Sequence, residues 1–524
     1  NHGDIAFYCT VAKNLAAGRG FVIDYIWNFW DRPAGIPTPS NVWWMPLPSA
    51  LCALGMAVGG SSYAAAQLTM IAVSSVLPLL AWLLGRELFA DGRVALLGAA
   101  LCAGFHLFLD KPCAPLSHGP YLVLATLSLW LIVRSARTGR GCGLAGAAIA
   151  ATQLARSDGI LLLVPLVVAH LARGSLGGGS LARGNLAGGI RVPQGRLPWR
   201  RLLLVPLGYA AVMAPWWAHN LAVHGALMPG GSFRAVFMRE YEQWYSLPES
   251  VTAATWLADG WGPVLALKAS VAWTNLGAAA TGLVSGATDR VGAFEHPALT
   301  TLLALSWVGL LVMFRRGFAA FWALLAAEWT FYSLVFTAVG IESFRTALFS
   351  VYPVLLLAAA AGLLLLADRA CALLPPRRTR EPLASALAAL VAGAILCGQV
   401  AYAAQALDRR AEGVRELTAF HEVLSKVVAQ RCGDPASVVL MARDVHELHA
   451  LTGLRCVQIP YEPERVVREV ARRYGVTHLL LLGAPGEPTL RPALEHLELN
   501  PHYELVEGPS RAFGRTFRIY RLLD

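Results

Sequence analysis

The sequence has few charged residues, and this scarcity excludes most classes of soluble protein. Charged residues make up 15% of the 524 residues, whereas hydrophobic residues make up 56%, and the mean hydropathy is +0.52. A typical soluble domain carries about 25% charged residues. The composition therefore predicts a polytopic membrane protein.

Several sequence motifs of binding and catalysis are also missing. The nine cysteines form no CxxC pair and no Cys/His spacing typical of zinc sites. For Cys432 and Cys456, a disulfide and two buried free thiols fit equally well. The glycines form neither a GxGxxG fingerprint nor a P-loop, so nucleotide binding has no support. The chain opens on Asn1 without a signal peptide, which predicts that a spanning helix precedes it.

Arginines supply most of the net charge of +10, and they gather in short loops between apolar segments. This pattern is typical of cytoplasmic loops and does not indicate a nucleic-acid partner. If all the clusters are cytoplasmic, five regions lie on the outer side: 1–61, 110–118, about 219–297, 341–345 and everything after 404. We therefore expect a multi-pass protein of the inner (cell) membrane, in contact with membrane lipids. The clusters fall at 134–140, 173–201, 315–316 and 369–380.

Apolar runs of the length needed to cross a membrane, about 20 residues, occupy the centre of the chain. The stretch 45–58 is too short and too rich in proline to span, and we expect it to lie along the membrane surface. The glycine-rich stretch 174–199 predicts a flexible linker. About ten spanning helices are expected, at 62–84, 93–109, 119–135, 143–156, 158–173, 201–218, 298–314, 318–340, 346–367 and 384–404.

Three regions follow from this division. Residues 1–61 are predicted to form an outer catalytic loop with interfacial helices, and residues 62–404 a transmembrane helix bundle. In residues 405–524, helical and strand patterns alternate, which predicts an extracytoplasmic α/β domain. The predicted fold class is thus mainly α, a polytopic transmembrane helix bundle with a C-terminal soluble α/β domain.

Asp4 and Asp110 are the candidate catalytic residues. Asp4 precedes a predicted helix, so it could cap that helix, and it could also take a proton from an acceptor hydroxyl just outside the membrane. Asp110 lies at the outer end of a predicted helix, beside Lys111. It either anchors that helix at the interface or helps to bind and deprotonate the acceptor. With a histidine, the two acids could hold a divalent cation.

Two further candidates lie in the RSDG turn at 156–159. Ionisable groups at membrane depth face a cavity or a partner, so Arg156 and Asp158 form either a structural ion pair or a ligand contact. Glu342 and Arg345 lie in a predicted outer turn. An arginine there suits a phosphate through forked hydrogen bonds, or an ordinary lipid headgroup.

The last two candidates belong to one outer region of basic and aromatic residues. His219 lies in the PWWAHN segment at 215–220, whose tryptophans also fit an interfacial belt. Arg234 lies in the loop that follows, among several aromatic residues. Such a mixture suits an anionic headgroup that carries a sugar.

Four segments resemble the GT-C superfamily of integral-membrane glycosyltransferases, in the branch of bacterial aminoarabinose transferases and protein O-mannosyltransferases. LARSDG is similar to the family's TRPEG turn, and PWWAHN to its PWxxRN motif. The family's paired acidic residues are reduced here to Asp4-Ile5, and the arginine of PWxxRN is His219. The segments are GDIAFY at 3–8, WMPLP at 44–48, LARSDG at 154–159 and PWWAHN at 215–220.

The resemblance implies an inverting transfer of a sugar from a polyprenyl-phosphate donor to an acceptor hydroxyl at the outer membrane face. Asp4 matches the family's catalytic aspartate, and Asp110 sits where some members place a second acid. Arg345, by analogy, would stabilise the leaving phosphate. The sugar and the acceptor, whether a glycan, a lipid or a protein, stay open.

Two other classes of function compete with this one. A lipid or glycan transporter would place ionisable or helix-breaking residues near the middle of its spans. Here the ionisable residues gather at the outer ends instead, which favours chemistry at the surface. A non-catalytic subunit of a cell-envelope assembly would use residues 405–524 for protein contacts, and replacing Asp4 would leave glycosylation unchanged.

Overall fold

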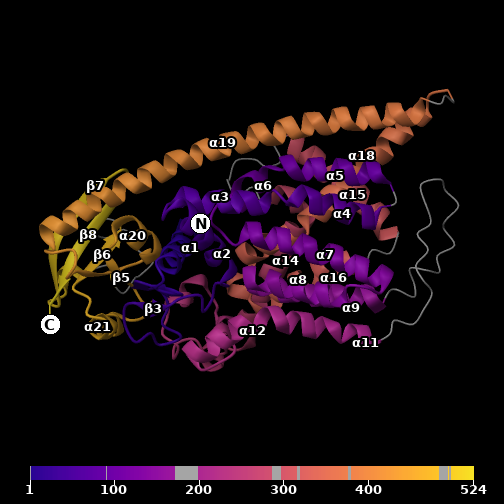
Figure 1. Cartoon of the computed structure of the whole chain (residues 1–524). Coiled ribbons are helices and arrows are strands. Elements are labelled where there is room, and N and C mark those ends of the chain that lie inside the picture. Colours follow the sequence, from indigo (N-terminus) through magenta and orange to yellow (C-terminus); the bar gives the residue numbers. More distant parts are fainter. Residues whose placement is uncertain are drawn as a thin grey trace.

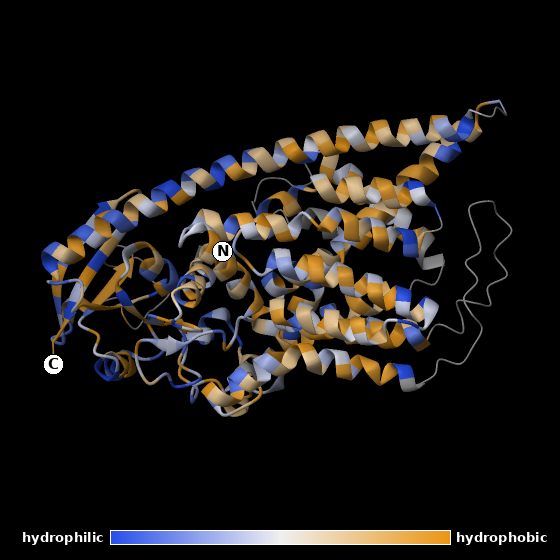
Figure 2. Ribbon diagram, in the orientation of Figure 1, coloured by the Kyte–Doolittle hydropathy of each residue, from blue (hydrophilic) through white to orange (hydrophobic). Residues whose placement is uncertain are grey.

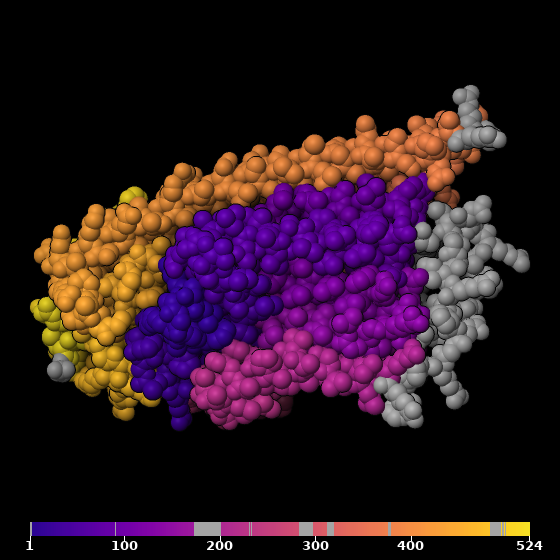
Figure 3. All heavy atoms as spheres, viewed as in Figure 1, coloured from indigo at the N-terminus to yellow at the C-terminus, as the bar shows by residue number. Residues whose placement is uncertain are grey.

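The computed structural model of the chain describes residues 2–89, 91–171, 199–229, 231–285, 297–315, 319–375, 379–482, 494 and 497–523. A bundle of apolar helices forms one end of the molecule, and a sheet with short helices forms the other (Figure 1). The N-terminal segment, indigo in Figure 3, lies between the two. The predicted linker 174–199 lies outside the described residues except for Trp199.

The bundle consists of helices whose side chains are apolar over most of their length, with hydrophilic residues at the ends (Figure 2). By length and composition, the described residues contain four helices able to cross a membrane, or up to six if each bent pair is one span. The bundle as a whole is built from α3 (Tyr63–Ser74), α4 (Leu77–Leu88), α5 (Gly92–Gly104), α6 (His106–Asp110), α7 (His118–Thr138), α8 (Cys142–Ala155), α9 (Leu163–Leu171), α12 (Leu204–His224), α14 (Trp261–Ser285), α15 (Pro297–Arg315), α16 (Ala319–Thr330) and α18 (Tyr352–Ala372).

In the described residues, three of the ten expected positions hold apolar helices of 10–17 residues, which are too short to cross a membrane by themselves. These are Cys142–Ala155, Ser157–Leu171 and Pro297–Leu311. The predicted interfacial segment forms α2 (Leu47–Gly59), which has 13 residues. As predicted, it is too short to span by itself.

Helix α14 corrects the expectation that 219–297 is one outer loop. Its residues pack against α15, α16 and the turns around Gly340. Lys268 anchors it, because its ammonium group donates to the carbonyl of Leu334 at 2.5 Å and to the hydroxyl of Thr337 at 3.2 Å. The lysine and the interspersed Ser, Thr and Asn residues lower the hydropathy of this stretch. The pattern of apolar runs therefore does not predict this helix.

Glycines allow the bundle helices to approach closely. A Cβ atom at Gly309 of α15 would collide with the carbonyl oxygen of Ala358 of α18, and one at Gly362 would lie 2.4 Å from the carbonyl oxygen of Leu305. Small residues at helix contacts bring backbones together, and van der Waals packing then holds helices that the surrounding lipid does not drive together. The α15–α18 pair uses this device.

Helix α19 (Arg380–Arg431) has 52 residues and runs along the whole molecule (Figure 1). Its first half is apolar and its second half is richer in hydrophilic residues (Figure 2). The predicted span 384–404 is thus the first part of a longer helix, and the predicted boundary at 404/405 falls inside that helix. The change from apolar to polar composition marks where this helix leaves the bundle, not where one structural unit ends.

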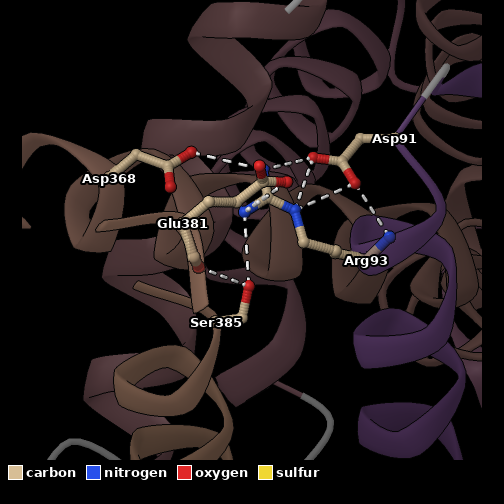
Figure 4. Close-up of polar contacts among 5 residues, drawn as sticks. All are labelled: Asp91, Arg93, Asp368, Glu381 and Ser385. Atoms are coloured by element: carbon tan, nitrogen blue, oxygen red, sulfur yellow. Dashed lines mark hydrogen bonds and ion pairs between the residues drawn. The ribbon is translucent and has the colours of Figure 1, made fainter. Parts of the chain in front are cut away.

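A cluster around Arg93 fixes the beginning of α19 (Figure 4). The Arg93 guanidinium lies 2.8 Å from the Asp91 carboxylate, 3.5 Å from that of Asp368 in α18 and 3.9 Å from that of Glu381 in α19. It also donates to the hydroxyl of Ser385 at 3.3 Å. One arginine therefore joins α5, α18 and α19 at the bundle end opposite the sheet.

The end of the molecule opposite the bundle holds a six-stranded sheet in the order β2-β5-β4-β6-β8-β7. Strands β2, β5, β4 and β6 are parallel, and β8 is antiparallel to both β6 and β7. Helices α20 (Val445–Thr452) and α21 (Glu464–Arg473) make the crossovers. The strands are β2 (Tyr25–Ile26), β4 (Val439–Ala442), β5 (Arg455–Gln458), β6 (His478–Leu482), β7 (Tyr503–Ala512) and β8 (Arg515–Leu522).

Strand β2 comes from the predicted catalytic loop of residues 1–61, called the first loop below, and not from the C-terminal part of the chain. It pairs Tyr25 with Cys456 and Ile26 with Val457. The predicted domain of residues 405–524 therefore includes a strand from residues 1–61. Cys432 and Cys456 are both free thiols, and Cys456 donates to the carbonyl of Leu454 at 3.2 Å.

Candidate functional site

Asp4 lies in the first turn of α1 (His2–Ala16). The helix starts at His2, so Asp4 is not the N-cap residue that the sequence allowed. Its negative charge is still favourable there, because the N-terminus of a helix carries a partial positive charge. Helix α1 packs between α2 and α20, which places Asp4 between the bundle and the sheet.

The Asp4 carboxylate is partly buried, and no side chain in the described ranges forms a hydrogen bond or ion pair with it. Burial raises its pKa above the usual range of an aspartate, while the positive charges of Arg156 and Lys111 oppose that rise. A carboxylate of this kind is a stronger base than an ordinary surface aspartate, and it is not occupied by a structural bond.

Two tyrosines share this environment. Burial raises the pKa of the Tyr8 hydroxyl, one helical turn after Asp4, and the Asp4 charge adds to that effect. The pKa of Tyr241, in the turn Tyr241–Tyr245 after α12, is raised by the same two causes. Both hydroxyls therefore stay protonated at physiological pH.

Arg156 and Asp158 form a buried ion pair where α8 ends. The Arg156 Nε and Nη2 groups donate to the Asp158 carboxylate at 3.0 Å and 2.9 Å, and the Tyr332 hydroxyl donates to it at 2.6 Å. The guanidinium lies over the Tyr121 ring, 5.3 Å from its centroid. The Asp158 side chain is 1% exposed and that of Arg156 is 18% exposed. Arg156 is thus held rigidly, with its charge still felt at Asp4.

A second buried acid, Glu328, adjoins this pair and was missed in the sequence. It is 1% exposed and accepts from the Ser350 hydroxyl at 2.5 Å and from the Tyr121 hydroxyl at 3.5 Å. Helix α16 turns into a short π-helix (Phe331–Val335) just after it. The signal was present, because Glu328 is the single acidic residue in the apolar stretch 318–340.

Asp110 does not stand free beside Asp4. It forms an ion pair with Arg410 of α19, and its side chain is 11% exposed. The neighbouring Lys111 contributes its positive charge to the field at Asp4. The ion pair therefore fixes the end of α6, and with it the position of the lysine.

The other predicted residues lie in separate contacts. The His219 ring stacks on Trp216 at 4.8 Å, and Arg234 donates to the carbonyls of Pro248 and Val251 at 2.5 Å and 3.3 Å. Arg345 pairs with Glu342 at 2.9 Å on α17 (Gly340–Ala347). Within the described part of the chain, no hydrogen bond or ion pair joins these side chains to Asp4 or Arg156. The Nε of Arg345 is buried without a hydrogen-bond partner there.

Aromatic rings wall the site on the side of the first loop. Trp44 lies 4.2 Å from Phe7 of α1, 4.6 Å from Trp27 and 5.3 Å from His446 of α20, measured between ring centroids. Aromatic pairs at these distances contribute about 0.5–1.5 kcal/mol beyond their buried area. These rings therefore form a packed wall that joins α1 to α20.

The described residues near Asp4 and Asp110 do not form a site for the divalent cation that the sequence allowed. Among the residues that the structure describes, no three His, Cys, Asp or Glu side chains are grouped to hold a metal ion. Asp110 is engaged by Arg410, and the charged side chains that act on the Asp4 pKa are the cations Arg156 and Lys111. These residues do not fit a metal, and no step below passes through one.

Residues 39–181 match the family model of dolichyl-phosphate-mannose-protein mannosyltransferases. The whole chain superposes on ArnT from Cupriavidus metallidurans in the apo state, with a TM-score of 0.56, 13% identity, and coverage of 98% of this chain and 93% of that chain. The chain has the GT-C glycosyltransferase fold. The same protein bound to undecaprenyl phosphate matches with a TM-score of 0.53, 14% identity and the same coverage. No curated protein matches the chain in sequence.

The likeness to ArnT confirms the predicted helix bundle with a C-terminal strand-containing domain. The family-model match over residues 39–181 agrees with the predicted class of enzyme, a membrane glycosyltransferase. The family match covers only part of the chain, but that part contains the first five predicted spans and the WMPLP and LARSDG segments.

Proposed function

We propose that the protein transfers a sugar from a polyprenyl-phosphate donor to an acceptor hydroxyl, with inversion, at the outer face of the inner membrane. One observation carries the proposal: the Asp4 carboxylate is partly buried, forms no hydrogen bond or ion pair with a described residue, and interacts electrostatically with the positive charges of Arg156 and Lys111. The GT-C fold and the ArnT structure with undecaprenyl phosphate support a polyprenyl-phosphate ligand for this site.

In this proposal Asp4 accepts the proton of the acceptor hydroxyl. The acceptor oxygen then attacks the anomeric carbon from the face opposite the phosphate, and the bond between that carbon and the phosphate oxygen breaks. The configuration inverts, the electron pair leaves with the polyprenyl phosphate, and the proton stays on Asp4. The acceptor is a glycan, a lipid or a protein.

Negative charge develops on the phosphate as that bond breaks, and fixed cations stabilise it in the transition state. Arg156 and Lys111 suit this role because Asp158, Tyr332 and the Asp110–Arg410 pair hold them in place. Asp158 and Asp110 act as positioning residues in this scheme. Asp110, the second predicted catalytic acid, therefore acts through Lys111.

We further propose that Arg345 contacts the phosphate side of the donor, where a phosphate oxygen would satisfy its buried Nε. Glu342 orients it through the 2.9 Å ion pair. His219 and Arg234 shape the surrounding loop through their ring stack and carbonyl contacts. These residues contribute to substrate binding rather than to proton transfer.

The test is a transfer assay with purified protein in lipid nanodiscs, a panel of polyprenyl-phosphate sugars and a membrane extract as the source of acceptors. The product is followed by the release of free polyprenyl phosphate that depends on the acceptor. We expect release by the wild type and a loss of about 10²–10⁴-fold in Asp4→Asn. A transporter would release no polyprenyl phosphate, and equal release by both proteins would refute the assignment of Asp4.

A further inference from the structure

A cavity of about 220 Å³ lies between the sheet, α20 and α19, on the side of α20 that faces away from Asp4. Residues that follow β4 and β5, the end of β6 and one face of α19 line it. From β4 the chain crosses through α20 to β5, and α21 then returns it to β6 on the other side of β4. The cavity therefore lies where the strand order reverses. In sheets with parallel strands, ligands bind at such a reversal, beyond the carboxyl ends of the strands.

The walls of the cavity are apolar and its rim is charged. Leu424, Leu448, Ile459, Leu480 and Leu481 supply aliphatic surface. The guanidinium of Arg515 lies over the Phe420 ring at 5.5 Å. The wall thus consists mainly of aliphatic side chains with one aromatic ring, a surface that suits the apolar face of a small ring.

The rim offers hydrogen-bonding groups that no other part of the described chain uses. The side chains of Asp444, Glu447 and Arg515 line the cavity and form no hydrogen bond or ion pair with described residues. Burial and the nearby Asp444 raise the pKa of Glu447 to about 6. Polar side chains in a partly dry site carry a desolvation cost that a ligand with matching groups relieves.

We propose that this cavity binds one sugar ring, as a neutral ligand with several hydroxyl groups and one apolar face. The two acids Asp444 and Glu447 outnumber the cation Arg515 among these side chains, which disfavours an anionic ligand. Adjacent hydroxyls of a sugar donate to Asp444 and Glu447 and accept from Arg515, while the ring's apolar face lies on the leucines. The volume is below the roughly 300–1,000 Å³ of pockets for drug-sized ligands, which fits a single ring.

The position of the cavity links it to the candidate active site. Helix α20 presents Glu447 and Leu448 to the cavity and His446 to Phe7 and Tyr25 on the opposite side. The sugar site is thus one helix away from α1, which carries Asp4. A sugar unit of an acceptor glycan and a free sugar both have the hydroxyl groups and the apolar ring face that this cavity would bind.

Binding is measured by saturation-transfer difference NMR on the full chain in nanodiscs prepared without sugar-based detergents. The probes are methyl glycosides of glucose, mannose and galactose, the corresponding disaccharides, and L-leucine as a zwitterion. Leu482→Trp fills the cavity from its rim, where Leu482 is 40% exposed, and Leu505→Trp on β7 is the matched control at 45% exposed. Glu447→Gln removes a rim carboxylate, with the exposed Glu422→Gln as its control.

We expect saturation transfer to at least one glycoside, a loss of about tenfold or more in Leu482→Trp and Glu447→Gln, and no change in the two controls. A response to disaccharides as well as methyl glycosides identifies a glycan unit as the ligand, and a response to methyl glycosides alone identifies a free sugar. Transfer to L-leucine only, no transfer to any sugar, or a signal unchanged in Leu482→Trp overturns the proposal. Asp4→Asn should bind like the wild type, so this result is independent of the proposed transfer reaction.

Discussion

The imidazole Nδ1 of His446 lies 3.0 Å from the hydroxyl of Tyr25, and this hydrogen bond ties α20 to the first loop. Burial lowers the pKa of His446 to about 3, so the ring is neutral at physiological pH. Tyr25 is fully buried and belongs to β2, the strand that the first loop adds to the six-stranded sheet. Through this contact the C-terminal part of the chain supports the segment that carries Asp4.

Breaking this hydrogen bond should loosen the loop. We expect Tyr25→Phe and His446→Phe each to lower stability by about 1 kcal/mol, because each removes one partner of a buried hydrogen bond. The double variant should lose little more than either single variant, since both changes remove the same bond. Thermal unfolding of the purified protein measures this, and losses that simply add would show that the two residues act independently.

The buried pair of Arg156 and Asp158 should matter far more for stability than an exposed pair. Asp158→Ala leaves a buried guanidinium without its partner, a change that costs about 3–5 kcal/mol. The matched control is Glu249→Ala, which breaks the Arg32–Glu249 pair, whose side chains are 67% and 61% exposed. Exposed pairs contribute at most about 1 kcal/mol. Similar losses in both variants, measured by chemical denaturation, would contradict the rigid placement of Arg156.

Much of this site was visible in the sequence, and the reasons for the gaps are physical. The GDIAFY and LARSDG motifs supplied Asp4, Arg156 and Asp158 because ionisable groups stand out in an apolar chain. The partner of Asp110 was not visible, because Arg410 lies 300 residues away in sequence and only the length of α19 brings it back. The two-residue strand β2 carries no periodic pattern, so its place in the six-stranded sheet could not be predicted.

Asp110 and Arg410 allow a test of the positioning role. Arg410→Asp alone sets two acids against each other and should lower both the unfolding temperature and the transfer rate. Combining it with Asp110→Arg restores the ion pair with reversed charges. If Asp110 only positions Lys111, the double variant recovers most of the stability and part of the rate. Recovery of stability with no recovery of rate would mean that the Asp110 carboxylate itself takes part in the reaction.

Removing the charge of Asp4 should stabilise the folded protein. Because burial raises the Asp4 pKa in the folded state, the charged form is disfavoured there, and stability falls as pH rises from the unfolded pKa through the folded pKa. Asp4→Asn should therefore unfold at a higher temperature than the wild type at pH 7. The difference should vanish at a pH below the ordinary aspartate value of about 3.9. A lower unfolding temperature at pH 7 would show that the carboxylate makes a stabilising bond.

The most direct test of the central claim is the pH dependence of transfer by the wild type and Lys111→Met. If Asp4 is the base, kcat/KM falls as pH falls through a pKa above the ordinary aspartate range, since burial raises that pKa. Lys111 opposes the rise, so the acid limb should move to higher pH in Lys111→Met, and Asp4→Asn should show no such limb above its residual rate. An acid limb that persists in Asp4→Asn at nearly wild-type rates would contradict the assignment of Asp4 as the base.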